Sequence, residues 1–195
     1  MKNRQTLSLV LIITVLLTAC GGSDSQSSDS GQTPPPTTPT NPTIPTSLCV
    51  NTSGQVNWPA LMAEDCPVLS QYGLFIDPTN PTIQPQAPGF SYQLATQLFS
   101  NYASKYRFIY LPAGSSIQYQ AQEAFEFPTG AVLVKTFALP QDTAITGIAN
   151  ETLIETRLLI KRPQGWTSLV YQWQQGEAKL LTAGASVHHT LINQG

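Results

Sequence analysis

The clearest pattern of hydrophobic and polar positions lies between residues 153 and 173, on both sides of the turn Arg162–Gly165. Side chains of a strand point alternately to its two faces. The first arm is therefore predicted to carry Leu153, Glu155, Arg157 and Leu159 on one face and Ile154, Thr156, Leu158 and Ile160 on the other. Leu169, Tyr171 and Trp173 share a face of the second arm. This pattern predicts a β-hairpin, and large apolar groups on both faces predict that it lies inside a sheet.

The same two-residue period recurs along the chain, between turns that contain Pro or Gly. It occurs at residues 106–111, 117–119, 125–127, 131–139, 178–182 and 186–192. About seven to eight short strands of this kind are typical of an all-β domain, and we expect a β-sandwich or a barrel.

Two segments have less regular patterns. Residues 69–88 are rich in Pro around the apolar stretch 72–76, and we expect them to cover an edge of the domain. Residues 93–103 place Leu94, Leu98 and Tyr102 at helical spacing, which predicts either a short helix or an irregular turn.

Residues 1–20 have the pattern of a bacterial lipoprotein signal peptide. Lys2 and Arg4 precede an apolar run at 7–17, which ends in Leu-Thr-Ala-Cys20. This ending resembles a lipobox, in which the cysteine is acylated, for example with palmitate, and anchors the chain to the lipid bilayer. The alternative is an ordinary secretory signal with a cysteine there by chance. The residue after this cysteine is Gly21. In Gram-negative lipoproteins, Asp at this position favours retention at the inner membrane. By resemblance to them, Gly21 implies an outer-membrane anchor facing the periplasm.

Composition divides the remaining chain into two parts. Residues 21–47 are rich in Ser, Thr and Pro and predict a disordered tether, which leaves residues 48–195 for the β-rich domain. A net charge of −2, with only 10% charged residues, excludes the basic surface of a nucleic-acid-binding protein. No apolar run after residue 20 is long enough to cross a bilayer.

Cys49 and Cys66 are predicted to form a disulfide, because an exported chain enters an oxidising compartment. Closing a loop of this length stabilises a fold by roughly 3 kcal/mol in the chain-entropy model. A redox or metal-binding pair is the alternative, but no C-x-x-C and no nearby His supports it.

Lys135, Glu155 and Arg157 are the candidate ionic cluster. Glu155 and Arg157 share a face of one strand, and Lys135 belongs to a strand expected nearby. The cluster either fixes the strand register or binds an anionic ligand. We expect Arg157 to be buried and paired with a carboxylate, either Glu155 or, from another strand, Glu126.

The sequence offers little for catalysis. It contains no Ser-His-Asp order, H-E-x-x-H, phosphate loop or paired-acid signature, and we expect no catalytic, cofactor-binding or metal-binding residues. His188 and His189 are neighbours that would face opposite ways in a strand. Most aromatic residues are expected in the core, with a few on an exposed face as a platform for a sugar or a partner protein.

Three segments carry a family resemblance: QLFSNYASKYRFIYLPAG, FEFPTGAVLVKTF and ETRLLIKRPQGWTSLVYQW. They resemble the N-terminal β domain of exported bacterial diheme c-type cytochrome-like proteins, over residues 72–184. In that family a C-x-x-C-H motif, which binds haem, follows this region. The present sequence contains no C-x-x-C-H, so no haem-binding residue can be assigned and no cofactor is expected.

Three functions follow as hypotheses. The first is a non-catalytic binding or accessory module in the envelope, with an envelope redox protein as a partner. The second is the remnant, or the separated N-terminal part, of a cytochrome-like electron-transfer protein. The third and weakest is a glycan-acting enzyme or a lectin, which would need converging carboxylates or an exposed aromatic row.

Overall fold

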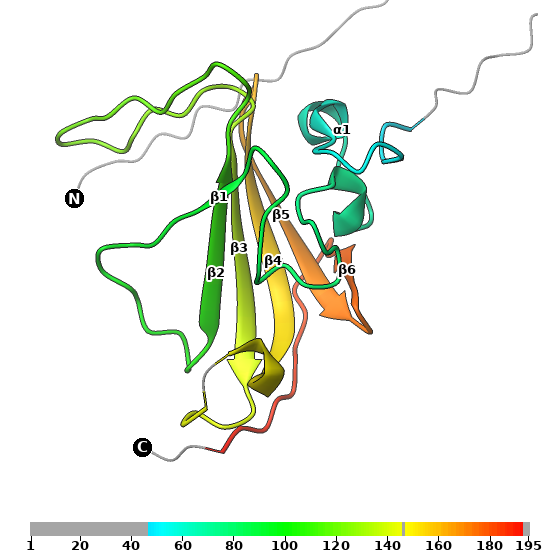
Figure 1. Ribbon diagram of the computed structural model, residues 1–195, viewed down its shortest axis with the longest axis vertical. Coiled ribbons are helices and arrows are strands. Elements are labelled where there is room, and N and C mark those ends of the chain that lie inside the picture. The colour runs from blue at the N-terminus through cyan, green and yellow to red at the C-terminus, as the bar shows by residue number, and fades with distance from the viewer. Residues whose placement is uncertain (1–46, 146, 193–195) are drawn as a thin grey trace, which may run out of the picture. The chain divides into compact units, whose positions relative to one another are not determined.

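The computed structural model describes residues 47–145 and 147–192. These form an all-β domain with one six-stranded antiparallel sheet, in which strands that follow in sequence are neighbours in space (Figure 1). The predicted all-β class is confirmed. The signal peptide, with Cys20, and nearly all of the predicted tether lie outside the described residues. The strands are β1 Phe90–Ser91, β2 Ser104–Tyr110, β3 Val132–Pro140, β4 Glu151–Arg162, β5 Gly165–Gln174 and β6 Glu177–Leu180.

The predicted hairpin is β4 and β5. Arg162 pairs with Gly165 across a two-residue loop, and β4 lies between β3 and β5. The prediction that this hairpin lies inside the sheet is therefore confirmed. Three short helices accompany the sheet: α1 Trp58–Ala63, η1 Leu69–Tyr72 and η2 Ile148–Asn150. None of the helices in the described part of the chain has the length and apolar character needed to cross a bilayer.

The sheet has fewer strands than the seven or eight that were expected. Residues 117–119 and 125–127 meet only in the bridge Gln118↔Glu126, and residues 186–192 only in the bridge Asp142↔Ile192. These segments do alternate in sequence, but they pair only through isolated bridges and do not become strands of the sheet. Residues 93–103 form no helix and adopt the irregular alternative.

The second layer of this sandwich-like domain is a segment of loops and short helices and contains no second sheet. We call residues 48–75 the covering layer. It lies on one face of the sheet, the inner face, whose buried residues include Phe108, Val134, Leu158, Ile160, Leu169 and Tyr171. Phe75 packs edge-on against Phe108, at 6.1 Å between ring centroids, and Tyr72 against Tyr171, at 6.2 Å.

These contacts correct part of the prediction that residues 69–88 cover an edge of the domain, because their apolar stretch 72–76 lies over the inner face of the sheet. Tyr72 reaches β5, while Leu74 accepts a hydrogen bond from the Tyr110 hydroxyl on β2 through its backbone carbonyl. The stretch therefore crosses the inner face from one side to the other. Gly73 makes the sharp turn that this requires, since its φ is +64° and a Cβ there would lie 2.3 Å from the Gln55 carbonyl oxygen.

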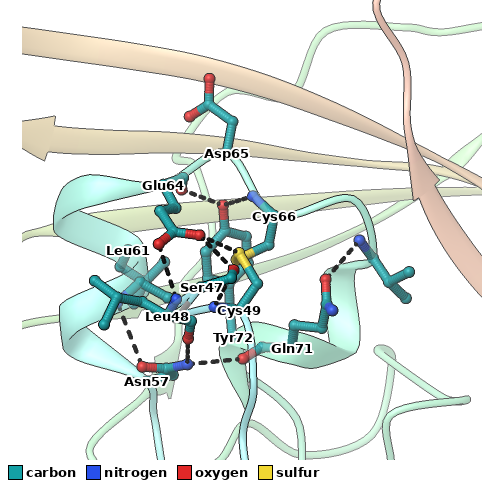
Figure 2. The surroundings of a disulfide bond; sticks show 12 residues. Ser47, Leu48, Cys49, Asn57, Leu61, Glu64, Asp65, Cys66, Gln71 and Tyr72 are labelled. Carbon is teal, nitrogen blue, oxygen red and sulfur yellow. Dashed lines mark hydrogen bonds between the residues drawn. A yellow bond between two sulfur atoms is a disulfide. The ribbon is translucent and has the colours of Figure 1, made fainter. Parts of the chain in front are cut away.

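The predicted disulfide between Cys49 and Cys66 is present, with Cα atoms 5.4 Å apart (Figure 2). It joins the start of the covering layer to the segment after α1. Asn57 caps α1 by accepting a hydrogen bond from the Ala60 amide, at 3.3 Å. The Glu64 carboxylate accepts a hydrogen bond from the Leu48 amide, at 2.8 Å, and this contact lowers the pKa of Glu64. The disulfide and the Glu64 hydrogen bond thus tie the start of the covering layer to the residues that follow α1.

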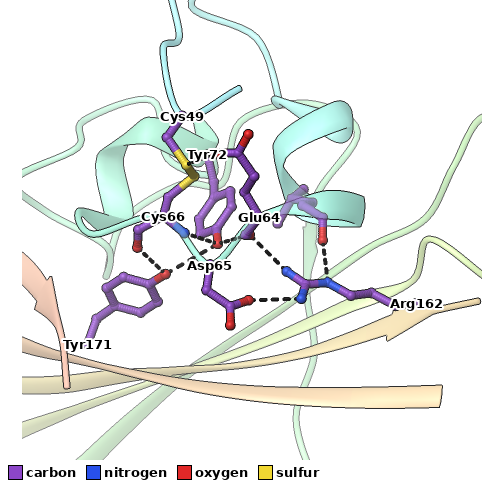
Figure 3. Close-up of polar contacts among 8 residues, drawn as sticks. Cys49, Glu64, Asp65, Cys66, Tyr72, Arg162 and Tyr171 are labelled. Atoms are coloured by element: carbon purple, nitrogen blue, oxygen red, sulfur yellow. Dashed lines mark hydrogen bonds and ion pairs between the residues drawn. A yellow bond between two sulfur atoms is a disulfide. The ribbon is translucent and has the colours of Figure 1, made fainter. Parts of the chain in front are cut away.

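Buried polar groups join the covering layer to β4 and β5 (Figure 3). The Tyr171 hydroxyl donates to the Cys66 carbonyl, at 2.8 Å, and burial raises the pKa of Tyr171. Arg162 donates to the carbonyls of Leu61, at 2.9 Å, and Glu64, at 2.8 Å. Its guanidinium also pairs with Asp65, at 2.8 Å. Because α1 leaves its last carbonyls without helical partners, Arg162 provides a donor for the Leu61 carbonyl. It shares the Glu64 carbonyl with the Tyr72 hydroxyl, which donates to it at 2.9 Å.

A β-bulge changes the predicted faces of β4. Phe137 pairs with Glu155 and Ala138 with Leu153, so Ile154 is an extra residue in β4. Leu153 consequently packs against the core of the inner face, whereas the alternation predicts it beside Glu155 and Arg157. Ile154, in turn, lines a groove together with Glu155. Strict alternation therefore holds only from Glu155 onward.

Candidate functional site

The outer face of the sheet, opposite the covering layer, carries a row of three cations. The register pairs Arg107 on β2 with Lys135 on β3, and Lys135 with Arg157 on β4. We call these three residues the cation row. Lys105 precedes Arg107 by two positions and shares its face. The chain has nine Lys and Arg residues in total, so four of them gather on this part of one face.

Among the residues that the structure describes, one carboxylate forms an ion pair with the cation row. Glu155 binds Arg157, with an Nε–Oε1 distance of 2.6 Å. The Arg157 side chain is 54% exposed and that of Glu155 20% exposed. The predicted pairing with Glu155 is therefore present, but the prediction that Arg157 is buried is wrong. The neighbouring Leu159 is also well exposed, because the covering layer lies on the other face. Glu126, the alternative partner, lies in the β2–β3 connection and bridges Gln118 instead.

Phe137 provides an aromatic surface between two members of the row. The Lys135 ammonium lies 4.4 Å from the centre of its ring, and the Arg157 guanidinium 5.2 Å. Cations over an aromatic face are attracted by the negative charge of the ring. The ring therefore holds both side chains in place without neutralising either charge.

Arg107 is the unusual member of the row, because it is 94% buried, with a relative exposure of 6%. Its guanidinium donates to the Lys105 carbonyl at 3.4 Å, which is at the long limit of a hydrogen bond. Neither Arg107 nor Lys135 forms an ion pair with any carboxylate in the described part of the chain. A buried arginine normally has a carboxylate or several carbonyls around it, so Arg107 has capacity for further acceptors.

The electrostatic effect of this crowding is visible at Lys135. Its pKa lies below the usual value because partial burial removes water from the ammonium, and because Arg107, Lys105 and Arg157 repel its charge. Glu155 opposes this shift only weakly. Like charges directly opposite each other on neighbouring strands destabilise a sheet. The cation row is therefore a poor device for fixing strand register, and an anion would relieve the repulsion.

A groove of about 610 Å³ begins at Arg157 and Glu155. It lies between the outer face of β4 and β5 and the segment 181–187. That segment is held at its start by the Leu181 amide, which donates to the Val170 carbonyl at 2.8 Å. Further along, His189 bonds the Pro140 carbonyl at 2.8 Å. The groove walls are largely apolar: Leu139, Ile154, Val170, Leu181 and Val187.

The sequence therefore predicted part of this site. Lys135, Glu155 and Arg157 are brought together as expected, and Arg107 is the member that sequence reasoning missed. A signal for Arg107 was present in the sequence. This residue alternates with the apolar Phe108, which places it on the opposite face of β2 from the core, and β2 pairs directly with the strand of Lys135. The groove was not predictable, because it depends on the bulge at Ile154 and on a C-terminal segment that forms no strand.

The remaining candidate residues lie elsewhere. Phe108, Tyr110, Tyr171 and Trp173 are buried in the core as predicted. Tyr119 and Trp166 are exposed, and Trp166 packs edge-on against Phe127 at 5.5 Å. Within residues 47–145 and 147–192, no group of three or more His, Cys, Asp or Glu side chains is placed to hold a metal ion.

Comparison with known proteins adds no assignment. No family model, no curated protein and no solved structure matches this chain. The resemblance to diheme c-type cytochrome-like proteins stays a prediction from the three sequence segments.

Proposed function

We propose that this chain is an outer-membrane-anchored periplasmic lipoprotein whose β domain acts as a non-catalytic binding or accessory module. The observation that carries the binding role is the cation row, in which three cations in register share one carboxylate partner within residues 47–145 and 147–192. A cluster kept for stability would carry balancing charges, because like charges across strands weaken a sheet. A surface kept for an anionic partner would leave the charges available.

Two features support export and anchoring. The sequence at 1–20 has the charge, apolar run and Leu-Thr-Ala-Cys ending of a lipoprotein signal. The Cys49–Cys66 disulfide suits an oxidising compartment such as the periplasm. Acyl chains on Cys20 would each contribute about 0.8 kcal/mol for every CH₂ buried in the bilayer, and several chains would hold the domain firmly.

Replacing the acylation site tests the anchor. In the Cys20→Ala variant we expect most of the protein to leave the membrane fraction, because no other part of the chain offers a lipid attachment site with this pattern. Fractionation of the envelope after a carbonate wash measures this, and the Cys49→Ala variant controls for the loss of a cysteine as such. A Cys20→Ala protein that stays membrane-bound after the wash contradicts the proposal.

A second candidate function rests on the sequence resemblance alone. The three segments that carry it contribute to β2, β3 and the β4–β5 hairpin, the central part of the sheet. On this hypothesis the domain is the separated N-terminal part of a cytochrome-like electron-transfer protein, and its partner is an envelope redox protein. A reading frame directly downstream that encodes C-x-x-C-H would favour this function over the first.

A further inference from the structure

We propose that the outer face of the sheet binds an acidic, partly apolar segment of a partner protein, with its carboxylates on the cation row and its apolar side chains in the adjoining groove. This inference deepens the proposed function, on which it rests, by naming the chemistry of the partner. Two independent features point to the same ligand. They are the unbalanced charge of the cation row and the apolar groove that begins at Arg157.

The strand register sets the spacing of the three cations. Neighbouring strands lie about 4.8 Å apart, so Arg107, Lys135 and Arg157 form a line roughly 10 Å long across β2, β3 and β4. In an extended peptide, alternate side chains point the same way and are about 6.8 Å apart. A segment that crosses the strands can therefore bring two carboxylates to the three cations. Arg157, whose side chain is 54% exposed, offers the forked geometry that binds a carboxylate with two hydrogen bonds, while Arg107, with a relative exposure of 6%, contributes its positive charge.

The burial of Arg107 provides the second step. Arg107 has a relative exposure of 6%, and its guanidinium donates one long hydrogen bond, at 3.4 Å. A desolvated guanidinium interacts more strongly with an incoming carboxylate than an exposed one does, because less water screens the charge. Lys135 lies directly beside it and is only partly exposed. The site therefore combines an accessible cation, Arg157, with two less accessible cations, Lys135 and Arg107, on the neighbouring strands.

The groove fits a protein segment better than a simple polyanion. Its walls of Leu139, Ile154, Val170, Leu181 and Val187 are contiguous with Arg157, since Arg157 itself lines the groove. A polyphosphate or a lipid headgroup has no apolar side chains to bury there. Glu155 also lies at the groove and would repel a uniformly negative chain. A peptide in which acidic and apolar residues alternate satisfies both the cation row and the groove.

Binding of defined probes to the purified full-length chain tests the inference. The main probe is a short fluorescein-labelled peptide in which aspartate alternates with leucine, followed by fluorescence anisotropy at physiological ionic strength. Two comparison peptides replace aspartate with asparagine or leucine with serine. Inorganic polyphosphate and vesicles containing phosphatidylglycerol serve as competitors. We expect saturable binding of the aspartate–leucine peptide and weaker binding of both comparison peptides.

Two variants with the same change in charge provide the control. Lys135→Gln removes the central cation of the row, and Lys161→Gln removes a lysine of β4 that lies over Trp166. We expect Lys135→Gln to raise the dissociation constant about tenfold or more, because the loss of a hydrogen bond to a charged group weakens binding by about that factor. Lys161→Gln should change the dissociation constant less than about twofold. Thermal unfolding of both variants verifies that they fold.

Several outcomes would overturn the inference. These are the absence of saturable peptide binding, equal weakening by the two variants, or displacement of the peptide by polyphosphate or vesicles at lower concentration than by unlabelled peptide. The last outcome would assign the face to a phosphate-bearing polymer or to a membrane surface. If the peptide does not bind but Cys20 still anchors the chain to the membrane, the acidic partner segment is rejected. The proposed membrane-anchored module is then unaffected.

Discussion

Replacing Arg162 with alanine is expected to lower the free energy of unfolding by about 2–4 kcal/mol, since hydrogen bonds to charged groups contribute roughly 1.5–3 kcal/mol each. The Arg162 side chain is 13% exposed and donates to the carbonyls of Leu61 and Glu64 as well as to Asp65. Its loss removes the Arg162 donor from the Leu61 carbonyl of α1, while the Glu64 carbonyl just beyond the helix keeps its hydrogen bond from the Tyr72 hydroxyl, at 2.9 Å. The covering layer then loses a principal polar contact with β4.

Arg157 provides a matched control in the same strand. It lies five positions earlier on the opposite face, and its side chain is 54% exposed. Its pair with Glu155 is a surface pair, so Arg157→Ala should cost less than about 1 kcal/mol. Chemical denaturation of the two variants, followed by tryptophan fluorescence, gives both values. Equal losses, or a larger loss for Arg157→Ala, would mean that the two faces of β4 have been assigned to the wrong environments.

Removing the disulfide is the second change with a large expected effect. The variant Cys49→Ala/Cys66→Ala should lose about 3 kcal/mol of stability, because the open chain gains conformational freedom when it unfolds. Both positions are buried, and they lie 17 positions apart in the sequence. Alanine is preferable to serine here, since a buried hydroxyl without a partner would add its own cost.

Reduction of the unmodified protein is the control for this variant. Denaturation in the presence of a thiol reductant should give a loss close to that of the double variant, because both remove the same covalent link. A loss below about 1 kcal/mol in both experiments would contradict the role of the disulfide given by the chain-entropy model. The covering layer would then be held by Arg162, Tyr171 and apolar packing alone.

The parts of the fold that were predictable are those in which local pattern and pairing agree. Residues 131–139 and the β4–β5 hairpin from Glu155 onward alternate strictly, and Pro163 marks the loop. The helix α1 was missed because six residues are too few for a helical period to show. Its one local signal is Asn57 before Trp58-Pro59, a helix N-cap followed by proline in the first turn.

The errors of placement have a common physical cause. Alternation gives the two faces of a strand but does not say which face meets a covering layer. Leu153 and Leu159 suggested burial of the face that carries Arg157, yet the bulge at Ile154 moves Leu153 to the inner face and Leu159 stays exposed. The members of the ionic cluster were grouped correctly, but their burial was misjudged. Register within a sheet follows from local turns, while coverage depends on a distant segment.

The central claim is that the outer face of the sheet is the binding surface of this domain. Chemical-shift mapping by NMR, with the aspartate–leucine peptide added to the isotope-labelled protein, tests it most directly. We expect the largest backbone shifts at Arg107, Lys135, Arg157 and Val170 and in the segment 181–187. Shifts concentrated in the covering layer, residues 48–75, or around the exposed aromatic residues Tyr119 and Trp166 would contradict it.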